Sequence, residues 1–152
     1  MARERGEKTV AVNRKARHDY FVEDSFEAGL VLHGTEVKSM RLGRVSLKES
    51  FCAVKGGELF AFGMHISPYE QGNIHNKDPM RPKKLLMHRG QISRLGGLAQ
   101  RQGYALIPLK IYLRDGRMKM ELGLCKGKKM HDKRDDDAKR SAQRDMERAM
   151  KV

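Results

Sequence analysis

The densest group of chemically active side chains is a basic run near the C-terminus. Lys126-Gly-Lys-Lys-Met-His-Asp-Lys-Arg134 holds four lysines and one arginine in nine residues. Unpaired charges are too costly to desolvate, so the run predicts either a solvated linker or a surface held against something negative. Lysine and arginine neutralise phosphates, so the chemistry expected of such a surface is the binding of a polyanion.

The distribution of charge favours the second interpretation. The 152 residues include 32 lysines and arginines against 19 aspartates and glutamates, a formal net charge of +13. Residues 1–18 and 126–152 together contribute +8 of it. Basic arms on a milder globular body are typical of proteins that bind a phosphate backbone. An anionic membrane is the competing partner, but no apolar run approaches the roughly 18–20 residues of a span, and the arms lack aromatic anchors.

Residue types that serve in catalysis or metal binding are scattered. No two of the six histidines are spaced His-x-x-x-His, and neither Cys52 nor Cys125 has a second cysteine nearby, which excludes a zinc knuckle. The motifs GxxxxGKS, GxGxxG and GxSxG are absent. Three aspartates at positions 135–137 suit a helix N-terminus better than a metal. We therefore predict no catalytic residue, no metal site and no cofactor.

Two other functions fit the composition. A nuclease can be built on His65, Asp78 and Lys83, although no carboxylate cluster supports them. A basic ribosomal or assembly protein is the second alternative. These alternatives can be distinguished by experiment. An enzyme turns over RNA at substoichiometric amounts, whereas a protein that only binds RNA forms a stoichiometric complex with it. A resident ribosomal protein stays with all ribosomes through high salt.

Rings near the basic segments favour RNA over DNA. RNA recognition adds stacking on loops and ends to phosphate contacts, and no helix-turn-helix or basic zipper is present. The candidates for stacking are His18, Tyr20, Tyr69 and His131. A core position with its hydroxyl at the rim explains Tyr20 equally well, and a solvated tail position explains His131. Single, distant cysteines and a polar, basic N-terminus predict a cytoplasmic protein with reduced thiols.

Hydrophobic periodicity predicts a mostly β body. Alternating residues over 104–113 and 118–125, joined at Asp115-Gly116, predict a hairpin with Pro108 at an edge or a bulge. Further strands are predicted over residues 19–32 with a bulge near 23–25, and over 51–55, 58–64 and 82–88.

Short helices and one long loop complete the body. A helix begins after Gly34 with Thr35 as its cap, and another covers residues 88–102, where Gly96-Gly97 costs helix stability. Residues 66–82 predict a long polar loop, and loops of this length are usually functional.

These elements predict one small antiparallel barrel of the oligonucleotide-binding (OB) type, with about six strands and two or three short helices. The expected organisation is a disordered arm over residues 1–12, an OB-like RNA-binding barrel over 13–125 and a basic tail over 126–152. Residues 13–18 are expected to present polar and cationic side chains just ahead of the first ordered element. The apolar face of the tail is only alanines and methionines, so we predict that it is disordered when free and helical when bound.

Several motifs together resemble the small protein B (SmpB) family, the bacterial partners of transfer-messenger RNA in trans-translation. The motifs are Asn13-Arg-Lys-Ala-Arg-His-Asp-Tyr-Phe21, Gly34-Thr-Glu-Val-Lys-Ser39, His65-Ile-Ser-Pro-Tyr69, Asp78-Pro, Lys84-Leu-Leu86 and the run Lys126–Arg134. They occur in family order from about residue 13 to the end of the chain.

The resemblance implies which residues bind RNA. Positions tied to transfer-messenger RNA are matched by Asn13, His18, Glu27, Leu86 and Lys119, beside the cations Arg17, Lys126, Lys128 and Lys129. The tail signature that engages ribosomal RNA is matched by His131, Asp132, Lys133 and Arg134. Met150 falls near an apolar family position, with Ala149 before it where a larger residue can occur. Glu27 is unexpected because a carboxylate repels phosphate, but it can accept from base amino groups or orient an arginine.

The resemblance also implies a function, which is that of an RNA-binding adaptor for ribosome rescue. The barrel is expected to hold the tRNA-like domain and deliver the RNA to stalled ribosomes. The tail is expected to enter the vacant decoding centre and mRNA channel, so that the nascent peptide is tagged for degradation. Expected partners are the small-subunit RNA, with elongation factor Tu and alanyl-tRNA synthetase acting on the same RNA. One monomer per RNA is expected.

Overall fold

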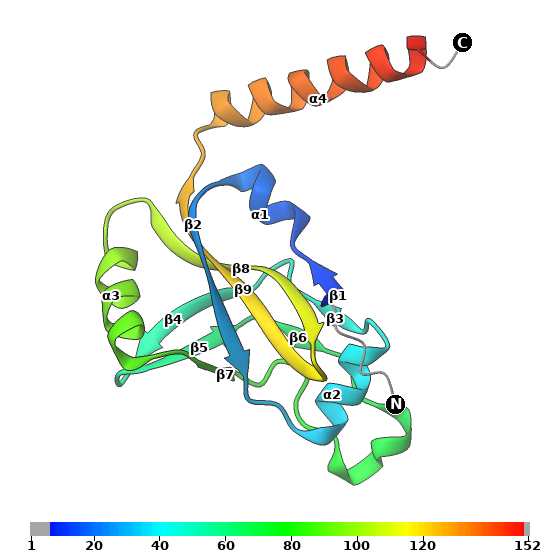
Figure 1. Ribbon diagram of the computed structural model, residues 1–152, viewed down its shortest axis with the longest axis vertical. Coiled ribbons are helices and arrows are strands. Elements are labelled where there is room, and N and C mark those ends of the chain that lie inside the picture. Colours follow the sequence, from blue (N-terminus) through cyan, green and yellow to red (C-terminus); the bar gives the residue numbers. More distant parts are fainter. Residues whose placement is uncertain (1–6, 151–152) are drawn as a thin grey trace.

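The computed structural model describes residues 7–150, without the side chains of residues 73, 74 and 130–132. Its elements are shown in Figure 1. In chain order they are β1 (Glu7–Val12), α1 (Arg14–Asp19), β2 (Tyr20–Leu30), α2 (Gly34–Arg41), β3 (Val45–Ser46), β4 (Phe51–Lys55), β5 (Glu58–Phe62), β6 (His65–Ile66), the 3-10 helix η1 (Glu70–His75), β7 (Lys83–Leu86), α3 (Arg89–Ala99), β8 (Tyr104–Arg114), β9 (Arg117–Gly127) and α4 (Met130–Met150).

Six strands close into a barrel. The order around the ring is β8, β4, β5, β7, β2 and β9, and β9 pairs back with β8. Every pairing in the ring is antiparallel. The predicted mostly β fold with a small antiparallel barrel is confirmed. Closure removes the exposed edges that an open sheet of these short strands presents to solvent.

The prediction of a disordered arm over residues 1–12 is wrong for residues 7–12. They form β1, which pairs with β8 from Glu7 opposite Arg114 to Val12 opposite Lys110. Glu7, a charged residue of this arm, forms ion pairs with Arg114 and Lys110 across the pairing. Residues 1–6 lie outside the described part of the chain.

The long hairpin and both predicted bulges are confirmed. β8 and β9 pair from Tyr104 opposite Lys126 to Arg114 opposite Arg117, and the register shifts after Pro108. A bulge accommodates the missing proline N–H without an edge position. In β2 the register against β9 shifts between Val22 and Asp24. Inward-facing side chains of the hairpin, among them Ile111, are fully buried in the barrel core.

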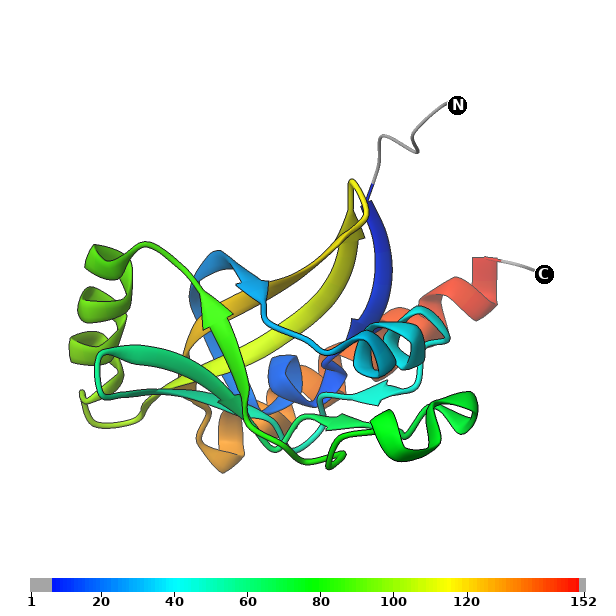
Figure 2. The same cartoon turned by 90° about the horizontal axis from the view of Figure 1, so that it is seen from below.

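Helices cover different parts of the barrel. Figure 2 shows α3 beside β4 and β5, and α2 with η1 at the opposite end. The predicted cap of α2 is wrong: Thr35 Oγ1 donates to the His75 carbonyl, and Glu36 accepts from the His33 amide at 2.8 Å instead. Thr35 already lies inside the helix, so its hydroxyl faces the neighbouring η1. No helix in the described part of the chain combines the length and hydropathy needed to span a bilayer.

The segment predicted as one long loop is partly ordered around a buried lysine. It contains Ile66 of β6 and the whole of η1, and Lys83 follows at the start of β7. Lys83 is completely buried, and its ammonium donates to the carbonyls of Met64 at 2.6 Å and Pro79 at 2.9 Å. Burial lowers the pKa of Lys83 to about 8, opposed by the nearby Glu36. Lys83 thus ties the loop to the barrel.

Lys83 should make stability rise in mildly alkaline solution. Between pH about 8 and 10.5 the unfolded chain binds a proton that folded Lys83 has lost, so the unfolding free energy increases with pH across this window. The gain should reach roughly 3 kcal/mol relative to Lys83→Met, in which other titrating groups cancel. Urea unfolding of both proteins at pH 7.5 and 10.5 measures it. A constant difference between the two would contradict the assignment.

Candidate nucleic-acid interface

Asn13 is a buried residue that positions α1, the first part of the interface. It is 3% exposed, and its amide donates to the carbonyls of Leu47 at 3.1 Å and Pro108 at 2.9 Å. Its side-chain oxygen accepts from the Ala16 amide at 3.1 Å and so caps α1. The polar groups of its side chain are therefore all engaged within the protein. Asn13 holds α1 on the barrel rather than offering hydrogen bonds to RNA.

The sequence does not predict the helix α1, since residues 13–18 are expected ahead of the first ordered element. Its six residues are too few for a stable isolated helix. The Asn13 cap and the burial of Ala16 supply the missing stability. The helix leaves Arg17 exposed and His18 partly exposed, so both predicted RNA-binding side chains are accessible.

The start of the tail is joined to α1 by a group of contacts that we call the tail clasp. Lys128 Nζ donates to the Arg17 carbonyl at 3.1 Å and forms an ion pair with Asp136. His18 Nδ1 lies 3.0 Å from Asp19, and His18 Nε2 lies 3.2 Å from Asp137 of α4. Lys133 lies 3.3 Å from Asp19. Asp136 and Asp137, which the sequence suggested as helix-terminus charges, thus contact cations expected to face RNA.

The clasp should be sensitive to pH through His18. Hydrogen bonding, first to Asp19 and then to Asp137, raises the pKa of His18 above its ordinary 6.5. The contact is complete below the ordinary value and weakens as pH rises through the raised pKa. An NMR titration of the imidazole should show a higher pKa in the native chain than in Asp137→Asn. Equal pKa values would place Asp137 away from the ring in solution.

Lys126 and Lys129 extend the basic surface at the hinge. Lys126 was predicted to begin the tail, but β9 runs to Gly127, so Lys126 belongs to the sheet. Lys126 lies opposite Phe21 on the neighbouring strand β2 and opposite Tyr104 on the neighbouring strand β8, and its ammonium lies 5.9 Å from the Tyr104 ring centre. The strand continues to Gly127 because Lys126 and Gly127 still lie opposite Phe21 and Tyr20 of β2. Beyond it, the Lys128 amide donates to the carbonyl of Asp19 in α1. Lys129 is exposed.

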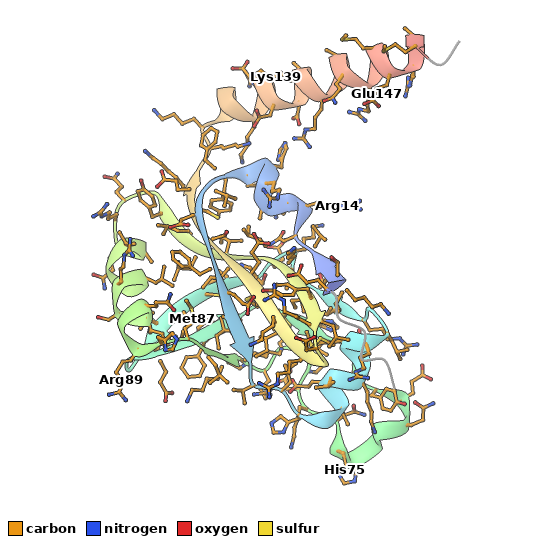
Figure 3. All side chains as sticks on the ribbon, viewed as in Figure 1. Arg14, His75, Met87, Arg89, Lys139 and Glu147 are labelled. Carbon is orange, nitrogen blue, oxygen red and sulfur yellow. The ribbon has the colours of Figure 1, made fainter. Side chains whose placement is uncertain are left out.

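The tail itself is the helix α4. It extends away from the barrel next to α1, and Lys139 and Glu147 point to different sides of it (Figures 1 and 3). Lys133 is partly exposed, Arg134 is exposed, and Met150 is 83% exposed near the end of the helix. His131 and Asp132 lie in α4, but their side chains fall outside the described ones. Helix formation is confirmed, while disorder in the free state stays a prediction.

A second group of predicted residues meets on the outer face of the barrel. Across adjacent strands, Leu86 of β7 lies opposite Gly29 of β2, and Gly29 lies opposite Lys119 of β9. A side chain at Gly29 would touch Leu86 at 3.4 Å, so the glycine lets Leu86 lie flat over β2. Glu27 lies two residues before Gly29, on the same face of β2. Leu86, 55% exposed, is therefore an apolar spot beside a cation, and we call this group the outer face.

Glu27 organises cations rather than facing RNA alone. It accepts from the Tyr112 hydroxyl at 2.5 Å and from Arg114 at 2.6 Å, and Lys119 Nζ lies 4.0 Å away. Hydrogen bonding from Tyr112 is the main cause that lowers the pKa of Glu27. Burial and Glu27 together raise the pKa of Tyr112 well above its ordinary range. The carboxylate stays ionised and fixes the direction of Arg114.

Tyr112 and Arg114 are not among the site residues that the sequence predicts. Their positions on alternate residues of β8 put both on the outer side of the barrel, which is the signal that could have found them. The cation–ring distances from Tyr112 to Lys110 and Arg114 are both 5.2 Å. Tyr112 lies opposite Lys119 in the β8–β9 pairing, so the two cations at its ring belong to the same part of the outer surface as Lys119.

The two groups are separate. Tyr20, next to α1, and Gly29, in the outer face, stand nine residues apart on β2, which corresponds to about 30 Å of strand. A single RNA that contacts both groups must therefore span about this distance. Tyr69 joins neither group: it carries Lys38 over its ring at 5.5 Å and bonds with Asn76 beside η1. Figure 3 shows His75 of η1 far from Arg14 of α1.

The position of Lys83 argues against the nuclease alternative, which needs this cation at the substrate. The Lys83 ammonium is buried and bonded to two carbonyls, so it cannot reach a substrate. Asp78 accepts from the Met80 amide in its own turn. Among the described residues, no group of three or more metal-binding side chains comes together.

Comparisons with known proteins agree on one family. The family model described as SmpB protein matches residues 10–152. The SsrA-binding protein of Clostridium beijerinckii is 61% identical over 151 residues, which is 99% of this chain and 97% of the relative. That of Acetivibrio thermocellus is 59% identical over the same shares. A solved structure presented as "tmRNA-SmpB: a journey to the center of the bacterial ribosome" is 46% identical, with a TM-score of 0.68, over 81% of this chain and 87% of its own.

Proposed function

This chain belongs to the SmpB protein family, and from that premise we propose that it binds transfer-messenger RNA and acts in ribosome rescue by trans-translation. The observation that carries the proposal is the meeting of Glu27, Leu86 and Lys119 on one outer face, although they stand far apart in the sequence. Exposed cations around an apolar contact suit RNA with unpaired or accessible riboses and bases.

The barrel and the tail divide the work in this proposal. The barrel, through α1, the hinge cations and the outer face, holds the tRNA-like domain of the RNA. The tail enters the decoding centre and mRNA channel of a stalled small subunit, with His131, Asp132, Lys133 and Arg134 nearest the ribosomal RNA. The 21 residues of α4 give about 31 Å of helix, enough to follow a channel.

The protein acts as an adaptor and not as a catalyst. It works in the cytoplasm as one monomer per RNA, and elongation factor Tu and alanyl-tRNA synthetase act on the same RNA. Its contribution is geometry: it presents the RNA to a ribosome whose decoding centre is empty, so that the nascent peptide is tagged for degradation.

The test is to identify the RNA that copurifies with the tagged chain from bacterial cells. We expect transfer-messenger RNA in a stoichiometric complex, unchanged covalently. Binding to the purified RNA should weaken steeply with salt, because lysines and arginines release several counterions. A chain that remains with all ribosomes through high salt is instead a resident ribosomal protein. A chain that cleaves RNA at substoichiometric amounts is an enzyme.

A further inference from the structure

An open hollow of about 1150 Å³ lies between α3 and strands β4 and β8. It exists because these strands separate: among the described residues, Cys52 opposite Leu106 is the one pair that joins β4 to β8. The helix α3 then stands beside the gap instead of filling it. Pockets for drug-sized ligands measure roughly 300–1,000 Å³, so this hollow is large for a surface depression.

One wall of the hollow is kept bare by Gly96 and Gly97. Glycine is among the least favourable residues inside a helix, and packing does not require either one. A methyl group at Gly97 would meet nothing within 4 Å, and one at Gly96 would touch Val54 at an ordinary 3.4 Å. The two glycines therefore cost helix stability without a packing reason. What they provide is space along α3.

Three aromatic rings, those of Tyr20, Phe51 and Tyr104, line the hollow. Phe51 is 48% exposed and is backed by Phe62, with ring centres 5.5 Å apart, so it offers its other face to a ligand. The Tyr104 hydroxyl donates to Glu23 at 3.0 Å, which fixes the ring. Rings held in this way are suitable surfaces for stacking bases.

The hollow is continuous with the α1 part of the interface. Tyr20 and Phe51 also line a smaller hollow of about 170 Å³ beside α1. Lys15 and Lys48 line it as well, together with Asp19 and with Glu49, which lies 3.2 Å from the Lys15 ammonium. The ammonium of Lys126 lies 5.9 Å from the Tyr104 ring centre, and Arg89 lies in the wall of the larger hollow. An RNA strand leaving α1 thus reaches aromatic rings flanked by Lys126 and Arg89, an arrangement that suits a phosphate backbone with its bases turned inward.

We propose that this hollow takes one or two unpaired nucleotides of the RNA held at α1, with bases stacked on Phe51 and Tyr104. The proposal rests on the proposed function and adds a place for nucleotides that leave the folded part of the RNA. Stacking of this kind is tolerant of sequence, because every base has a flat face. The bare wall at Gly97 leaves room for the ribose.

The decisive variant fills the hollow while favouring the fold. Gly97→Gln adds a helix-forming side chain to the wall and should raise Tm or leave it unchanged. It should weaken binding of in vitro transcribed transfer-messenger RNA about 10-fold, which corresponds to the loss of one stacked base. Phe51→Ala should weaken binding to a similar extent. The matched control is Gly90→Gln, because Gly90 lies on the same helix in open space and outside the hollow. We expect the control to bind RNA like the native chain.

Photo-crosslinking gives an independent measurement. RNA that carries 4-thiouridine should crosslink to Phe51 or Tyr104 in the native chain and lose these crosslinks in Gly97→Gln. Native affinity in both Gly97→Gln and Phe51→Ala, with crosslinks confined to α1 and the outer face, would overturn the proposal. The proposal would also be overturned if these variants kept their RNA affinity but lost a contact with a ribosomal protein. The hollow would then be a binding site for protein. Failure of the native chain to bind this RNA would instead overturn the proposed function itself.

Discussion

Removal of residues 132–152 should abolish peptide tagging on stalled ribosomes and leave binding of transfer-messenger RNA nearly intact. The buried core clusters of the described residues extend no further along the chain than Cys125, so the barrel should fold without α4. The truncation also removes Asp136 and Asp137 from Lys128 and His18. These cations then become available, so any change in RNA affinity should be a modest increase.

Two assays on the same preparations separate the functions. Single-turnover peptidyl transfer on ribosomes with truncated message reports tagging, and gel-shift titration reports binding of free RNA. A full-length chain with residues 132–152 scrambled controls for charge and length, and it should behave like the truncation in tagging. If the truncated chain loses its RNA as badly as its tagging, the division between barrel and tail is wrong.

Leu86→Asp should lower the affinity for transfer-messenger RNA about 100-fold, since the change removes an apolar contact and places a carboxylate where phosphates approach. The side chain is 55% exposed, so the substitution should leave the barrel folded. The effect should exceed that of Lys119→Ala, which removes one phosphate contact while Arg114 remains nearby.

The matched control is Met80→Asp. Met80 is 48% exposed in the segment between η1 and β7, outside both groups of the interface, and the charge change is the same. Filter binding at two salt concentrations distinguishes a local effect from a general one. Equal losses in Leu86→Asp and Met80→Asp would mean that net charge, and not the outer face, governs binding.

Local patterns in the sequence were sufficient for much of the barrel. The β8–β9 hairpin depends on a period of two and on the turn at Asp115-Gly116, where both residues adopt positive φ. The hairpin of β4 and β5 depends in the same way on Gly56-Gly57. Such signals lie within a few residues of the structure that they specify, so they can be read without knowing the fold.

The elements that were missed are held by distant partners. β1 is a strand because β8, about a hundred residues later, supplies its hydrogen bonds. The helix α1 is too short to form alone, and the carbonyls of Leu47 and Pro108 hold its cap in place. Lys83, a residue type expected in water, is buried because two carbonyls accept from it. No local pattern contains these partners.

The sequence by itself determined the kind of partner and the family, because charge, composition and ordered motifs do not depend on folding. The tertiary structure decided which of the matched residues can act together. Asn13 turned out to hold α1 from within, whereas Glu27, Leu86 and Lys119 meet because the β7–β2–β9 register sets them side by side. A slip of one residue in that register would turn Leu86 into the barrel. Register is fixed by closure of the whole ring, so only the folded chain specifies this surface.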